Sequence, residues 1–265
     1  MRRVMKMGLM KINFIAIIMV FAVITFTPPI FAADRVELDR KLLVRPGSTV
    51  EEVGVAFLKV SESLPDFNKI VTESESYKSL DTLAQKDFLA KNVIKLQKEF
   101  LDFSPKKSDL IIRMKVNTFF NRTPDGLGKL EVRTFKQDPI YFPFYFANYP
   151  IALIPKDMEL FKNIELSEDE TNIVYSRLAL DGAATLLLQL YPIAANDTKP
   201  VIFDNIPQYP MLTEIGYIGF LNRKGEQIWA WQNEKYNNKK FKDGSSQSLI
   251  DLIPEDKNPL TTPNQ

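Results

Sequence analysis

The 265-residue sequence contains no cysteine and no histidine. Without histidine, a Ser-His-Asp triad or a Cys-His pair cannot form, and His- or Cys-ligated zinc and iron sites are excluded. Without cysteine, the fold has to be stabilised by its hydrophobic core, because no disulfide can form. Chemistry is left to Asp, Glu, Lys, Tyr, Ser and Thr, and we predict neither a cofactor nor a metal site.

Glycine is sparse, with 10 residues, and neither G-x-G-x-x-G nor G-x-x-x-x-G-K-[ST] occurs, so nothing indicates a nucleotide site. Residues 1–33 hold four of the 34 basic residues and none of the 33 acidic ones. The chain after residue 33 therefore carries three more acidic than basic side chains. Nucleic-acid binders usually show a basic patch or stripe, so we predict no nucleic-acid partner.

The uncharged apolar run Ile12–Phe26 follows a basic start and precedes small residues at positions 32 and 33. This pattern predicts that residues 1–33 form a secretory signal peptide. The alternative is an uncleaved anchor over 12–33, but Pro28 and Pro29 would break a spanning helix and favour cleavage. Both interpretations place the chain from Asp34 onward outside the cytoplasm, either periplasmic or extracellular, or tethered to the inner membrane.

We predict an α+β fold, with N-terminal helices packed on a mainly antiparallel β-sheet of about six to eight strands. Residues 34–253 are expected to form a single exported domain, with a helical part at 46–104 and a β-rich part at 109–234. A separable helical piece is the alternative. The polar, proline-containing stretch 254–265 predicts a disordered tail.

Two helices are expected in the first third. Ser48 and Glu51 match a capping box, and apolar residues follow at helical spacing as far as Pro65. A longer helix is expected over Leu80–Phe103, again with an apolar stripe at intervals of three and four. The two stripes predict helices that pack on a sheet or on each other.

From Asp109 the hydrophobic period changes to two, which indicates half-buried strands. We expect three antiparallel hairpins: residues 110–120 with 130–132 around Thr123–Gly126, Ile173–Leu180 with Ala183–Tyr191 around Asp181-Gly182, and Glu214–Leu221 with Gln227–Gln232 around Asn222–Gly225. A short helix is expected over Ser245–Ile253.

The most unusual stretch is Tyr141–Tyr149, in which six of nine residues are aromatic. Pro143 cannot donate to a ladder, so we predict an edge strand with phenylalanines inside and tyrosines outside. One interpretation is that the stretch belongs to the core, in which case packing alone explains its aromatic residues. As a contact surface, Tyr141, Tyr145 and Tyr149 would bind a partner, since tyrosine is enriched at interfaces. An added partner strand and a sugar-stacking platform are further alternatives.

Three other residues are binding candidates. Arg177 is expected on the apolar face of the second hairpin, where it requires a carboxylate, a bound anion or a route to water. Trp229 and Trp231 project to one face of the third hairpin. The acidic group at 165–170 predicts a solvated turn rather than a calcium site, because its spacing does not match a calcium loop.

These observations favour a non-enzymatic envelope protein whose partner is another envelope or surface protein. Membrane contact is expected only through the N-terminal segment, if that segment is uncleaved. The alternative is a carboxylate-based hydrolase of cell-wall or envelope polysaccharide, which requires two carboxyl groups about 5–9.5 Å apart.

Overall fold

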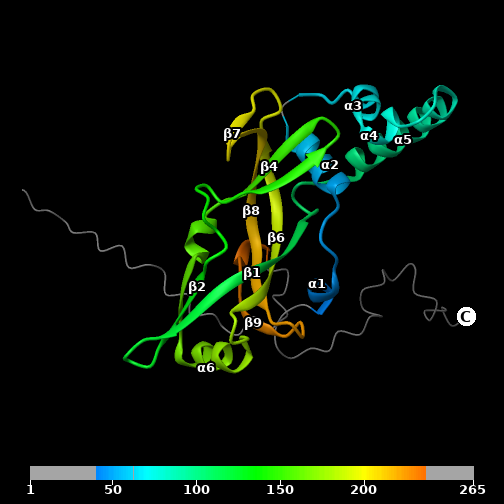
Figure 1. The fold of residues 1–265 in the computed structure, drawn as a ribbon. Coiled ribbons are helices and arrows are strands. Elements are labelled where there is room, and N and C mark those ends of the chain that lie inside the picture. The colour runs from blue at the N-terminus through cyan, green and yellow to red at the C-terminus, as the bar shows by residue number, and fades with distance from the viewer. Residues whose placement is uncertain (1–39, 62, 237–265) are drawn as a thin grey trace, which may run out of the picture. The chain divides into compact units, whose positions relative to one another are not determined.

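The fold was analysed in a computed structural model that describes residues 40–61 and 63–236 (Figure 1). The expected signal peptide or anchor (1–33), the helix at 245–253 and the tail at 254–265 lie outside these residues. The described helices are α1 (Arg40–Val44), α2 (Val50–Val60), α3 (Phe67–Glu73), α4 (Glu75–Lys78), α5 (Thr82–Asp102) and α6 (Glu168–Arg177), with 3-10 turns η1 (Met158–Phe161) and η2 (Glu234–Tyr236). None of these helices is long and apolar enough to cross a membrane.

The described strands are β1 (Leu110–Arg122), β2 (Gly128–Val132), β3 (Phe142–Phe146), β4 (Tyr149–Pro155), β5 (Asn163–Leu166), β6 (Ala183–Ala195), β7 (Val201–Phe203), β8 (Ile206–Leu221) and β9 (Gln227–Gln232). They form a mixed sheet in the order β3-β4-β8-β6-β1-β2-β5, and β7 and β9 also pair with β8. The described part of the chain thus has nine strands, more than the expected six to eight, and the predicted α+β fold is confirmed. The sheet is mainly antiparallel, with β4 and β8 as its parallel pair.

Strand β8 connects the sheet. It pairs with β6 along one edge. Its other edge pairs with β4 in the first half of the strand and with β9 in the second half, and its first three residues pair with β7. Figure 1 shows β6 and β8 running side by side through the middle of the sheet.

Two of the three expected hairpins are confirmed. Strands β1 and β2 pair with Phe120 opposite Leu130, and β8 and β9 pair with Phe220 opposite Trp229. In both cases a period-two pattern meets a turn that contains a glycine with positive φ, at Gly126 and Gly225. Local sequence therefore determines these pairings.

The hairpin expected between Ile173–Leu180 and β6 is wrong, because Glu168–Arg177 forms helix α6. Of the acidic group taken for a turn, Glu165 lies in β5, and Glu168, Asp169 and Glu170 form the first turn of α6, where carboxylates interact favourably with the helix dipole. Ser167 and Glu170 form a reciprocal capping box there. Strand β6 pairs instead with β1, which places Met114 opposite Leu186.

Helix α2 begins one residue later than expected. Its capping box is Thr49 with Glu52, whereas Ser48 accepts a hydrogen bond from the Ile111 amide of β1 at 3.0 Å and donates its own amide to the Ile111 carbonyl at 2.7 Å. The helix ends at Val60 rather than at Pro65.

Helix α2 lies against the sheet, with contacts to β6, β3 and β4. Its Val53 and Phe57 are fully buried in the main core. Gly54 permits the close approach to β3, because a Cβ atom at this position would lie 2.2 Å from Cγ of Phe146. Packing here therefore depends on the missing side chain.

Helix α5 matches the expected second helix apart from its first and last residues. It packs mainly against α3, α2 and α4, which lie beside it at one end of the sheet (Figure 1). The expectation that the N-terminal helices together cover the sheet is therefore not confirmed. The opposite sheet face has a second small core around Ile111, Leu187 and Tyr217, against which Leu42 and Leu43 of the α1 segment pack.

Candidate functional site

The three predicted contact tyrosines lie in different environments around the edge strand β3. Tyr141 precedes the strand, and its hydroxyl donates to Oδ2 of Asp204 at 2.7 Å. Its ring packs on Phe203 of β7, with centroids 4.9 Å apart. Burial raises the pKa of Tyr141, and the hydrogen bond to Asp204 raises it further. Tyr141 therefore connects β3 to the β7–β8 hairpin and is not a free contact residue.

Tyr149 is half-buried at the start of β4. Its ring lies 5.6 Å from that of Phe57 and 5.5 Å from that of Tyr209, measured between centroids. Burial raises the pKa of Tyr149, and the negative charges of Asp197 and Glu73 act in the same direction. This tyrosine belongs to the packing beneath α2 and is not part of a contact surface.

Tyr145 alone of the three fits the predicted surface role, because it is 60% exposed. Within β3 the predicted alternation is present, with Phe142 and Phe146 buried and Pro143 and Tyr145 exposed. The aromatic stretch thus divides into two anchoring tyrosines and one exposed tyrosine.

The register of β3 disfavours addition of a partner strand. Phe146 faces Tyr149 across a two-residue turn, so residues 142, 144 and 146 direct their backbone groups toward β4. Pro143 and Tyr145 then direct theirs to the outer edge, where Pro143 has no N–H to donate. Only the Tyr145 amide remains as an outward donor on this strand. Proline at the edge is a recognised protection against strand pairing.

Arg177, Trp229 and Trp231 have structural roles. Arg177, at the end of α6, donates from Nη1 to the Gln227 carbonyl at 2.6 Å, so the expected position on an apolar strand face is wrong. Trp229 is only 4% exposed, and its Nε1 donates to Oε1 of Glu170 at 3.0 Å. Trp231 is half-buried, with its ring centroid 5.3 Å from that of Phe161. Neither tryptophan offers a free face for a sugar.

Tyr145 lies on the wall of a groove, which we call the apolar groove, between β3 and the helices. It has a volume of about 360 Å³. Its apolar lining comes from α2, α3, α5 and the end of β3: Val50, Ile70, Val71, Phe88, Leu96, Tyr145, Phe146 and Ala147. Polar side chains from α4 and α5 line the rest, among them Ser76 and Asn92.

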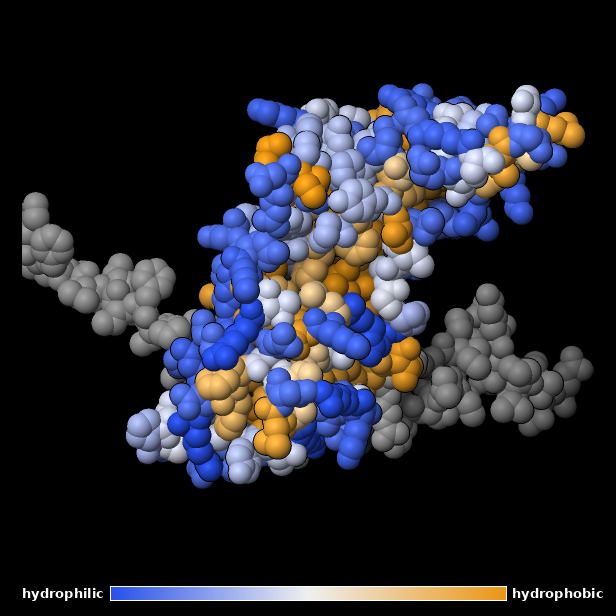
Figure 2. All heavy atoms as spheres, in the orientation of Figure 1, coloured by the Kyte–Doolittle hydropathy of each residue, from blue (hydrophilic) through white to orange (hydrophobic). Residues whose placement is uncertain are grey.

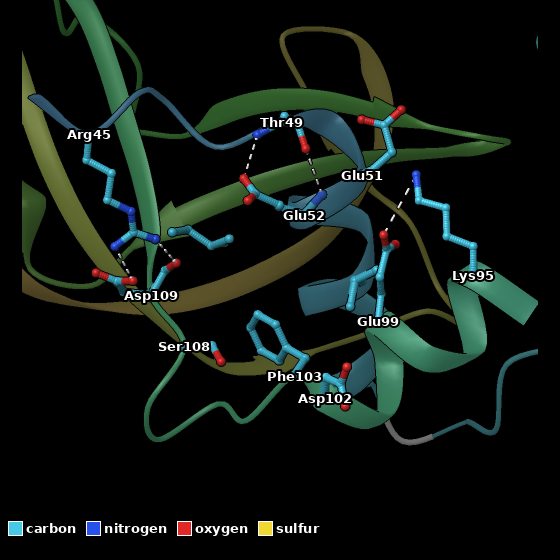
Figure 3. Close-up of a pocket in the computed structure, with 12 residues that line it drawn as sticks. Arg45, Thr49, Glu51, Glu52, Lys95, Glu99, Asp102, Phe103, Ser108 and Asp109 are labelled. Carbon is cyan, nitrogen blue, oxygen red and sulfur yellow. Dashed lines mark hydrogen bonds and ion pairs between the residues drawn. The ribbon is translucent and has the colours of Figure 1, made fainter. Parts of the chain in front are cut away.

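A second hollow, which we call the acidic cleft, has three lining residues in common with this groove. Figure 3 shows the residues that line the cleft. It has a volume of about 640 Å³ and is lined by five carboxylates and two basic side chains: Glu51, Glu52, Glu99, Asp102, Asp109, Arg45 and Lys95. Glu51, Lys95 and Glu99 line both hollows, so the groove and the cleft are neighbours beside α5.

Three of the five carboxylates already have structural partners. Glu52 accepts a hydrogen bond from the Thr49 amide at 2.9 Å in the capping box. Asp109 pairs with Arg45 at 2.5 Å and also accepts from Gln189. Glu99 lies 3.7 Å from the Lys95 ammonium, and Figure 3 shows this lysine reaching toward it.

The other two carboxylates, Glu51 and Asp102, form no hydrogen bond or ion pair within residues 40–61 and 63–236. Both are exposed to solvent. No cluster of carboxylates in the described part of the chain has the arrangement of a metal site. Because five carboxylates and only two basic side chains line it, the cleft has an excess of negative charge that attracts positive charge.

Sequence reasoning missed the helical side of this site. One signal was present: Glu99 and Asp102 occupy the last turn of α5, and that turn contains no basic residue. Carboxylates at a helix C-terminus oppose the helix dipole, so their placement there disfavours the helix and points to another role. No protein-family model, curated protein or solved structure matches the chain.

Proposed function

We propose that the protein is an exported, non-enzymatic envelope protein that binds a segment of another envelope or surface protein. The segment would insert an apolar side chain into the apolar groove and place lysine or arginine over the acidic cleft. The observation that carries this proposal is the pair of neighbouring hollows: the exposed Tyr145 lines the groove, and Glu51 and Asp102, which have no partner within the described residues, line the cleft.

Export rests on the N-terminal pattern of basic residues, the apolar run Ile12–Phe26 and the small residues that follow. A protein exported in this way meets its partners in the periplasm or outside the cell. The described residues would then lie in the same compartment as these partners, and membrane contact would be confined to the N-terminal segment if it is uncleaved.

The apolar groove has the features of an anchor site for one or two side chains. Leu96 and Phe146 are buried at its base, while Phe88 is half-buried and Tyr145 stands exposed beside it. An inserted side chain would remove apolar area from water at about 25 cal/mol per Å², and the tyrosine hydroxyl could still reach water or a partner group.

The acidic cleft adds specificity. An excess of carboxylates attracts a basic segment and repels an acidic one, and surface charges of this kind act mainly on the association rate and on partner choice. Glu51 and Asp102 would gain partners on binding, whereas the paired Asp109 and Glu99 would have to exchange theirs. We therefore expect binding to weaken as the salt concentration rises.

The test uses short synthetic peptides in which a Leu-Phe pair is flanked by lysines, with affinity measured by fluorescence polarisation on the purified protein. Matched peptides replace Leu-Phe by Ser-Ser or the lysines by glutamates. We expect binding of the first peptide only. Tyr145→Ala and the double variant Glu51→Lys, Asp102→Lys should each weaken it roughly tenfold, the scale of one lost anchor contact.

Tyr175→Ala is the control, because Tyr175 is also an exposed tyrosine but lies on α6 outside the groove. Equal binding of the lysine and glutamate peptides would contradict the role of the cleft. Unchanged binding in Tyr145→Ala would contradict the role of the groove.

A polysaccharide hydrolase is the second candidate, because Glu51 and Asp102 line the same cleft and have no partner among residues 40–61 and 63–236. Phe103 is the one aromatic side chain that lines this cleft, whereas polysaccharide sites stack sugars on several. Release of reducing ends from envelope polysaccharide by the wild type, lost in both Glu51→Gln and Asp102→Asn, would establish this function in place of binding.

A further inference from the structure

Helix α5 carries a second apolar stripe that faces away from its packed side. Leu83, Ile94 and Leu101 are 79%, 68% and 74% exposed, and Ala90 between them is also exposed. The four residues recur at intervals of seven, four and seven, close to whole numbers of helical turns, so they lie on one line along the helix. Figure 2 shows apolar side chains among the charged surface at this end of the molecule.

The stripe is distinct from both the core contact and the groove. The packed side of α5 presents Val93, Leu96 and Phe100, and the groove side presents Phe88 and Asn92. Neither group includes the four stripe residues. Such an apolar row on a helix of 21 residues is the pattern of a helix–helix seam.

The intervals between the four stripe residues are the same when read in either direction along the helix. This symmetry points to a second copy of α5 as the partner of the stripe. If a second α5 lies antiparallel across a two-fold axis near position 92, Leu83 meets Leu101 of the partner and Ala90 meets Ile94 of the partner. The small alanine then faces the larger isoleucine, so the two rows interdigitate. A two-fold interface of this kind requires a self-complementary patch, and the stripe has that symmetry.

The charges beside the stripe agree with this pairing. Asp87 and Lys98 lie on the same flank and form no ion pair within the described part of the chain. Across the two-fold axis, Asp87 of each copy lies beside Lys98 of the other, which gives two symmetric ion pairs. Lys91 near the axis faces its own counterpart and is the one unfavourable charge.

We propose that the protein self-associates through α5, as an antiparallel pair of helices joined along Leu83, Ala90, Ile94 and Leu101. A membrane surface is the other apolar environment that such a helix can meet. Lys91 and Lys98 beside the stripe would favour anionic lipid and Asp87 would oppose it, whereas the palindromic spacing and the Asp87–Lys98 pairing favour a second copy.

Disulfide formation tests the pairing, because the native chain has no cysteine. Full-length Leu83→Cys and Leu101→Cys copies with different tags are co-expressed and oxidised in the envelope. The antiparallel pair predicts that mixed dimers exceed both homodimers severalfold. Leu180→Cys is the control, because Leu180 is a fully exposed leucine that follows α6.

Homodimers in excess would overturn the antiparallel arrangement. A yield of cross-linked dimer no higher than that of the Leu180→Cys control would overturn self-association. If the protein instead binds anionic vesicles and Ile94→Asp abolishes that binding, the stripe contacts a membrane. Asp87→Lys should weaken the pair roughly tenfold, because attraction becomes repulsion at two positions. Asp87→Lys with Lys98→Asp should restore it, and failure to restore it would exclude the proposed register.

Discussion

Removal of the Glu170 carboxylate should destabilise the protein more than removal of either of the other two carboxylates in the first turn of α6, Glu168 or Asp169. Its Oε2 accepts from the amide and hydroxyl of Ser167, both at 2.8 Å, and its Oε1 accepts from the indole of Trp229 at 3.0 Å. The side chain thus caps its own helix and also ties that helix to β9.

The magnitude follows from these contacts. Glu170→Ala leaves the buried Trp229 N–H without an acceptor, which costs about 1–3 kcal/mol. Loss of the helix-dipole interaction adds about 0.3–1 kcal/mol. We therefore expect the free energy of unfolding to fall by about 2–4 kcal/mol, the sum of these terms and part of the cap.

The assay is urea unfolding followed by far-ultraviolet circular dichroism, which does not depend on tryptophan emission. Glu168→Ala is the matched control, because it removes a carboxylate from the same turn that makes no hydrogen bond within the described residues. In a Trp229→Phe background, Glu170→Ala should cost about 1–2 kcal/mol less, since no indole is left unpaired. Equal losses for Glu168→Ala and Glu170→Ala, or equal losses in both backgrounds, would refute the reasoning.

Three further predictions concern packing and ionisation. Gly54→Ala should lower the melting temperature although alanine favours helices, because its methyl group meets a ring of β3; an increase would contradict the close contact. Tyr141→Phe should cost about 0.5–1.5 kcal/mol in urea unfolding through its lost hydrogen bond to Asp204, whereas Tyr145→Phe should be neutral. Burial raises the pKa of Tyr191 from 10.0 to about 12, so its contribution to stability is present below pH 10 and is lost as the pH rises toward 12. The fall in the urea midpoint from pH 9 to pH 11 should therefore be smaller in Tyr191→Phe than in the wild type.

The elements that could be predicted from the sequence are those with strong local signals. The hairpins β1–β2 and β8–β9 combine a period of two with a glycine turn, and α5 combines a long apolar stripe with a capping aspartate at Asp81. Helix α6 was missed because Ile173–Leu180 alternates well enough to resemble a strand and is followed by Asp181-Gly182. Its capping box at Ser167 was the competing signal.

The candidate site could be predicted only in part, because it depends on contacts between distant segments. Tyr145 was identified as a surface residue from its place in an edge strand. The roles of Tyr141 and Tyr149 depend on Asp204 and Phe57, which lie far from them in the chain. The groove itself combines residues from four helices and one strand, and no one-dimensional pattern brings them together.

The position of β8 in the chain has a consequence for how the protein is made. This strand starts at Ile206 and holds β4, β6 and β9 together, so the sheet cannot assemble until most of the chain has been synthesised. Pairings between distant segments form slowly. A chain that is exported N-terminus first, as we propose, would therefore remain unfolded during its passage through a translocation channel. Its folding would be completed on the far side of the membrane, once residues 206–221 have emerged.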